Sequence, residues 1–94
     1  MSGPELRRAI LDLAERRGPD KTLCPSEVAR AVAGPDETKW RPLMRPIEAE
    51  AAHLAREGCV ALTRKGRPID PHATIRGIYR IAIVGDGATR PPRP

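Results

Sequence analysis

Large apolar and aromatic side chains are scarce in this sequence of 94 residues, which contains no Phe, one Trp and one Tyr. Leu, Ile and Val together make up only 18 residues, and none of them lies beyond Val84. A chain this short buries about 60–65% of its unfolded surface, so a single modest core must suffice and a second domain is excluded. We expect one folded domain over residues 1–84 and a disordered tail over residues 85–94, which are mostly Gly, Pro and charged residues.

Cysteine and long apolar runs are equally scarce. Cys24 and Cys59 alone do not make a disulfide framework. No run of about 18 apolar residues indicates a membrane span, and no N-terminal apolar segment indicates a signal peptide. We therefore expect a cytoplasmic protein that has no membrane contact and keeps both thiols reduced. Asn and Gln are absent and Arg outnumbers Lys 14 to 3, a bias that indicates a GC-rich bacterial genome.

Residue types that carry catalysis or bind metals do not cluster in the sequence. The soft metal ligands are Cys24, His53, Cys59 and His72, and no two of them have the close spacing of a zinc site. We find no nucleophile beside a base, no glycine-rich phosphate loop before a helix and no suitable pair of acids. The sequence therefore predicts no enzyme, no cofactor and no metal.

Apolar residues recur every three or four positions in three segments, which predicts three helices. The first helix runs from about Pro4 to Arg17. The second begins at Pro25, because proline suits a first helical turn. The third covers residues 40–57. Its apolar stripe consists of Trp40, Met44, Ile47, Ala51 and Leu54, and its opposite face presents Arg41, Arg45, Glu48, Ala52 and Arg56.

The start of the third helix contains two prolines. Pro46 does not fit deep inside a regular helix, so either the helix proper begins near Leu43 or a kinked turn precedes it. Trp40 heads the apolar stripe and is expected in the core, although stacking on a nucleic-acid base is the alternative. Pro42 and Pro46 distort the turn that would enter a groove of DNA, which favours contact with phosphates over base readout.

After Gly58 the apolar period changes to two, which predicts strands near residues 60–63 and 79–83. Between them lies a loop over residues 64–77, in which two prolines prevent regular pairing. Residues 21–23 suffice only for a bridge-like strand. A two-stranded hairpin is marginal in water, so the helices must cover its apolar face. This order predicts an α+β fold, a winged helix-turn-helix with three helices and a small two- to three-stranded antiparallel sheet.

Positive charge gathers in two segments of the chain. Residues 38–45 carry a net charge of +3 and residues 64–80 carry +4, whereas residues 46–63 carry −2. In the predicted fold these basic segments are the recognition helix and the wing, the two elements that touch a duplex. The predicted nucleic-acid-binding residues are Lys39, Arg41, Arg45, Arg64, Lys65, Arg67 and Arg76.

We therefore predict a nucleic-acid-binding domain that binds double-stranded DNA by electrostatic contact. A protein-interaction module without DNA binding is the alternative, because winged helices serve both roles. Residues 64–68 are similar to the core of an AT-hook, which enters a narrow minor groove, and a plain basic turn is the structural alternative. The oligomeric state stays open.

Three short runs resemble a known family. They are residues 24–30 (Cys-Pro-Ser-Glu-Val-Ala-Arg), 40–44 (Trp-Arg-Pro-Leu-Met) and 65–71 (Lys-Gly-Arg-Pro-Ile-Asp-Pro). In this order they are similar to a small bacterial family called domain of unknown function 3253, over roughly Leu6 to Val84. The resemblance implies a winged-helix-like fold and implies no activity, substrate or catalytic residue.

Overall fold

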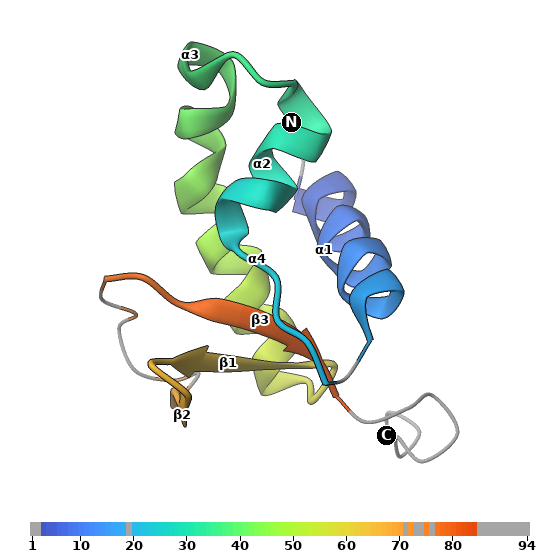
Figure 1. Cartoon of the computed structure of the whole chain (residues 1–94), viewed down its shortest axis with the longest axis vertical. Helices are drawn as coiled ribbons and strands as arrows, with labels where there is room; N and C mark the ends of the chain where they lie inside the picture. Colours follow the sequence, from blue (N-terminus) through green and yellow to red (C-terminus); the bar gives the residue numbers. More distant parts are fainter. Residues whose placement is uncertain (1–2, 19, 71, 73–74, 76, 85–94) are drawn as a thin grey trace.

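The computed structural model describes residues 3–18, 20–70, 72, 75 and 77–84, and its helices precede a small sheet (Figure 1). In this part of the chain four helices and one 3-10 turn are followed by three antiparallel strands. This order confirms the α+β class and is consistent with a winged helix. The expected disordered tail, residues 85–94, lies outside the described residues. The elements are α1 (Gly3–Arg17), α2 (Pro25–Ala33), α3 (Glu37–Trp40), the 3-10 turn η1 (Arg41–Leu43), α4 (Met44–Arg56), β1 (Val60–Arg64), β2 (Arg67–Pro68) and β3 (Arg80–Ile83).

Prolines divide the predicted third helix into α3, η1 and α4. Pro42 and Pro46 lack the N–H groups that an uninterrupted helix would direct to the carbonyls four residues earlier. The backbone tightens there into η1, where the Met44 N–H bonds to the Arg41 carbonyl. The helix proper therefore begins at Met44 after an irregular turn, as one of the two predicted alternatives describes. Helical backbone also extends back to Glu37, before the predicted start.

A single bridge and a carboxylate fix the start of α2. Leu23 pairs with Ile81 in an isolated antiparallel bridge, in which each backbone nitrogen lies 2.7 or 2.9 Å from the carbonyl oxygen of the other residue. This bridge confirms the predicted bridge-like strand. The Glu27 carboxylate accepts a bond of 2.7 Å from the backbone N–H of Cys24 and another of 2.7 Å from the Arg17 guanidinium. This carboxylate caps α2 and links it to the end of α1.

Stability at acid pH will depend on Glu27. The bond from Arg17, and next the bond from the Cys24 N–H, hold the pKa of Glu27 below its ordinary value of 4.5. A carboxylate whose pKa is lowered by folding stabilises the protein above its unfolded pKa, and this contribution is lost as the pH falls through the folded pKa. Urea unfolding at a series of pH values will show stability decreasing below pH 4.5, and Glu27→Gln will flatten that decrease. An identical pH dependence in the variant would contradict this role.

The central strand of the sheet is β1, with β2 on one side and β3 on the other. The pairing of β1 with β3 agrees with the predicted strands. The pairing of β1 with β2 corrects the expectation of an unpaired loop over residues 64–77, because Arg67 and Pro68 both join the ladder. A proline fits there because β2 is an edge strand, where a missing N–H leaves no partner unsatisfied.

A two-residue turn at Lys65 and Gly66 joins β1 to β2. Both residues adopt the left-handed backbone conformation, with φ values of 53° and 79°. Two consecutive left-handed residues form the tight hairpin turn for which Asn-Gly is the preferred pair. Residues 64–68 therefore form a tight basic turn and not an extended segment.

Lys65→Asn will raise the free energy of unfolding by up to about 1 kcal/mol, because asparagine tolerates the left-handed conformation better than lysine. Gly66→Ala will lower it by about 1 kcal/mol, since the new β-carbon is disfavoured at positive φ. Denaturant titration of both variants, followed by the fluorescence of the single Trp, measures these changes. A destabilised Lys65→Asn variant would contradict the turn geometry.

The core lies between the helices and one face of the sheet (Figure 1). Tyr79, expected under the helices, is buried, and Leu54 of α4 is fully buried. Ala52, expected on the outer face of the helix, is also buried, because α4 packs against α1, α2 and β1, which together cover more of its surface than one apolar stripe. Trp40 is half-buried and packs against the edge of the core. The buried apolar residues in the described part are Leu6, Ile10, Ala14, Leu23, Val28, Ala29, Ile47, Ala51, Ala52, Leu54, Val60, Leu62, Ile75, Tyr79, Ile81 and Ile83.

Candidate nucleic-acid interface

A row of exposed residues runs along η1 and α4. Residues four apart in a helix lie on the same face, and the members of this row follow that interval. Glu48 is half-buried and Ala52 is buried, so neither belongs to the exposed face on which the helical period predicts them. The same interval of four, counted onward from Arg45, leads to Ala49 and His53, which are the exposed residues of this face. The exposed row consists of Arg41, Arg45, Ala49 and His53.

The middle of this row suits close approach to a ligand. Ala49 has a short side chain, so the helix backbone is accessible between Arg45 and His53. Arginine can grip phosphate or guanine through two hydrogen bonds, and the imidazole of His53 adds a further polar group on the same face. The row therefore presents polar side chains on both sides of a small exposed residue, Ala49.

Arg41 is already engaged by its neighbours. It forms an ion pair with Glu37, one turn earlier, and its guanidinium carbon lies 5.7 Å from the centroid of the Trp40 ring. Arg30 of α2 lies 5.7 Å from the same ring. Guanidinium groups are attracted to the face of an indole, so both cations help to hold Trp40 in place. The charge of Arg41 is thus partly compensated.

Lys39 and Arg45 are the other two cations of α3 and the start of α4. Both are exposed, and neither forms an ion pair with another described residue. Together with Arg41 they make up what we call the helix cluster. Its charge available to a polyanion comes mainly from Lys39 and Arg45.

The second group of predicted residues surrounds the turn between β1 and β2. Arg64, Lys65 and Arg67 are all exposed, and we call them the hairpin cluster. A β-carbon at Gly77 would lie 3.4 Å from a guanidinium nitrogen of Arg64, so the chain that enters β3 passes beside this cluster. Arg76, the remaining predicted residue, lies outside the described residues.

The two clusters occupy different ends of the molecule, which measures 38 × 24 × 24 Å. Figure 1 shows α3 and the start of α4 at the upper end of the long axis, and the turn between β1 and β2 at the lower left. The predicted residues therefore form two separate basic surfaces and not one patch. One turn of duplex DNA spans about 34 Å, a length comparable with the long axis of the domain.

Tyr79 anchors the chain between the hairpin cluster and α4. Its side chain is 5% exposed, and its hydroxyl has no hydrogen-bond partner among the described residues. Burial raises the pKa of Tyr79, and the nearby Glu48 carboxylate and Cys24 thiol raise it further. The phenol is therefore neutral and lies near both α4 and the start of α2. The burial of Tyr79 in the core holds the segment that leads into β3 against the domain.

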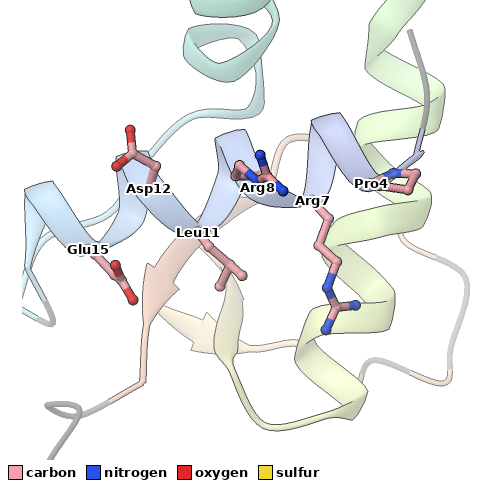
Figure 2. Close-up of a pocket in the computed structure, with 6 residues that line it drawn as sticks. All are labelled: Pro4, Arg7, Arg8, Leu11, Asp12 and Glu15. Atoms are coloured by element: carbon pink, nitrogen blue, oxygen red, sulfur yellow. The ribbon is translucent and has the colours of Figure 1, made fainter.

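A shallow groove runs along the outer side of α1 (Figure 2). Its charges are of both signs, and two of them, Arg7 and Asp12, are paired with residues outside the groove lining. Figure 2 shows Arg7 extending toward α4, where it pairs with Glu57, and Asp12 pairs with Arg16 at 3.3 Å. This groove therefore favours no single class of ligand. Its lining residues are Pro4, Arg7, Arg8, Leu11, Asp12 and Glu15.

Metal ligands and thiols are dispersed in the described part of the chain. It contains no group of three or more His, Cys, Asp or Glu residues placed to hold a metal ion. Cys24 and Cys59 are half-buried free thiols, and the Cys24 sulfur lies 3.1 Å from the Ser26 hydroxyl oxygen. None of the described helices is both long and apolar enough to cross a lipid bilayer.

The order of helices, bridge and sheet, with a helix and a hairpin that each carry exposed cations, is consistent with the winged-helix class of domains. A comparison with family models is more specific. The chain belongs to the family described as Protein of unknown function (DUF3253), whose model matches residues 4–84. This match confirms the resemblance seen in the three short runs. A search of curated proteins finds no match.

Proposed function

We propose that this domain binds double-stranded DNA by electrostatic contact from the helix cluster and the hairpin cluster. The observation that carries the proposal is the position of these exposed cations. They lie on the two elements with which winged helices contact a duplex, and they are spaced along the long axis of the domain. Contacts with phosphates supply most of the affinity in such an interface.

The two clusters have different roles in this proposal. The exposed row of α4 faces the major groove, where Arg45 and His53 flank the flat surface at Ala49. The hairpin cluster holds the phosphates on either side of the adjacent minor groove. Because Arg41 is paired with Glu37 and stacked on Trp40, it positions the start of the helix and contributes less charge.

A protein-interaction module on the same fold is the alternative function. Binding through phosphates weakens log-linearly as salt is added, because counterions are released, whereas an apolar protein interface depends much less on salt. Salt dependence therefore separates the two functions.

Titration of a fluorescein-labelled duplex with the full chain, at several salt concentrations, tests the proposal. If each of the five available cations meets one phosphate, the slope of log affinity against log salt will be about −4.5, and affinity will fall roughly 500-fold from ~50 to ~200 mM salt. No measurable binding at ~50 mM salt would overturn the proposal and favour the protein-interaction module. The available cations are the exposed basic residues of the two clusters that form no ion pair with another described residue, namely Lys39, Arg45, Arg64, Lys65 and Arg67.

A further inference from the structure

Ile78 is the large apolar side chain that the described part of the molecule leaves exposed, with 80% of its surface open to solvent. Its neighbours are the opposite. Tyr79 is 5% exposed and Ile75 is 9% exposed, so the chain is tied into the core on both sides of Ile78. The side chain of an isoleucine is branched at the β-carbon and therefore stiff, so Ile78 presents a rigid apolar group to solvent.

The surroundings of Ile78 are cationic. Gly77, directly before it, has a φ of 72° and lies beside the Arg64 guanidinium, which places Ile78 next to the hairpin cluster. Figure 1 shows the segment that enters β3 projecting at the left of the molecule, on the side of the turn between β1 and β2. One exposed apolar side chain therefore follows directly on a residue that lies beside the Arg64 guanidinium of the hairpin cluster.

This combination favours a nucleic acid over a protein as the occupant. Protein interfaces have an apolar core built from several side chains and depleted of charge, whereas Ile78 is the one large apolar side chain exposed in the described residues and has a cation, Arg64, beside the residue before it. Proteins that bind the minor groove use the opposite arrangement. Many of them insert an apolar side chain between the two base pairs of one step, and arginine or lysine beside it is attracted by the negative potential of the groove.

We propose that Ile78 is a wedge that enters the minor groove and partly unstacks one base step, while the hairpin cluster holds the flanking phosphates. This inference rests on the proposed function and adds to it the residue that enters the minor groove and a deformation of the duplex. Unstacking costs free energy, which burial of the isoleucine side chain against the bases offsets. Flexible steps such as TA will be preferred, because they unstack most readily.

Substitution of Ile78 and substitution of a basic residue will affect duplex binding differently. Ile78→Ala removes apolar contact but no charge, so it will weaken duplex binding about tenfold at every salt concentration and leave the salt slope unchanged. Lys65→Asn will do the reverse, lowering the slope by about 1. Since Ile78 is 80% exposed, Ile78→Ala will leave the thermal unfolding midpoint unchanged.

The experiment uses the full chain and a duplex of about 20 base pairs with 2-aminopurine at a central TA step, where loss of stacking raises its fluorescence. We expect saturation with the unmodified chain to raise this fluorescence, Ile78→Ala to abolish the rise, and Ile78→Met to retain it because methionine is also long and apolar. Lys65→Asn, at saturating concentration, will retain the rise as well.

Two results would overturn the wedge and leave the proposed function standing. One is steep, salt-dependent binding with no rise in fluorescence at the TA step. The other is equal duplex affinity of Ile78→Ala and the unmodified chain, which would assign this side chain to another partner, such as a protein. Absence of any duplex binding at low salt would overturn both the wedge and the proposed function.

Discussion

Replacing Leu54 with alanine will lower the free energy of unfolding by about 2–5 kcal/mol. Leu54 is fully buried on the inner side of α4. Its truncation removes apolar contacts and leaves a cavity that the surrounding core fills only in part. A loss of this size is a large share of the stability of a small domain, whose total is on the order of 5 kcal/mol. Urea titration, followed by the fluorescence of Trp40, measures it.

A matched substitution on α1 serves as the control for this effect. Leu11 is the same residue type in a helix but is only half-buried, at the edge of the core. Leu11→Ala will therefore cost distinctly less than Leu54→Ala. A loss below ~1 kcal/mol for Leu54→Ala would show that the packing face of α4 has been assigned wrongly.

Removing the charges of Lys65 and Arg67 together will weaken duplex binding about 10- to 100-fold at ~0.1 M salt and reduce the salt slope by about 2. The double variant Lys65→Asn, Arg67→Gln is suited to this test. Asparagine before Gly66 favours the left-handed turn, so the hairpin keeps its shape while its charge is lost. Fluorescence anisotropy of a labelled duplex, measured at several salt concentrations, gives both quantities.

The helix cluster allows the same test at the other end of the molecule. Lys39→Gln combined with Arg45→Gln removes two exposed cations that have no ion-pair partner among the described residues. We expect a reduction of the slope by about 2 for this variant also. If only the hairpin-cluster variant reduces the salt slope, the surface that contacts DNA is restricted to the wing.

The outer side of α1 offers a control with equal loss of charge. Arg8 and Arg16 are exposed there, and the ion pair of Arg16 with Asp12 contributes little to stability because both groups are solvated. Arg7 is unsuitable because it pairs with Glu57 of the segment after α4. Arg8→Gln, Arg16→Gln should leave the slope nearly unchanged. Equal losses in all three double variants would mean attraction by net charge without a docking site.

Most of the fold follows from local patterns in the sequence. The helical periods, the Pro and Gly residues at the element ends and the alternation near Tyr79 predict the helices and the two longer strands. They also indicate the single bridge at Leu23. These features depend on side chains near one another in the sequence, which is why a pattern can detect them. The strand β2 leaves no such pattern, because two residues are too few for alternation and one of them is Pro68.

The missed details of the site arise from contacts that a pattern does not contain. The predicted helix begins at Trp40 and therefore leaves out Glu37, so it does not contain the pair of residues four apart, Glu37 and Arg41, that forms an ion pair. Ala52 is buried because α4 packs against α1, α2 and β1, and two of these elements lie far from α4 in the sequence. The positive φ of Lys65 comes from the tightness of the turn, since lysine itself does not favour that conformation.

The borders of the sheet leave few backbone groups open to a further strand. On one border, β2 is two residues long and includes Pro68, which has no N–H to donate. On the other, Leu23 occupies both hydrogen-bonding groups of Ile81 in the middle of β3. An open strand edge is a template on which another chain can add and start aggregation. In the described sheet a second molecule meets only short, interrupted edges, so concentrated solutions of this domain should resist edge-to-edge association.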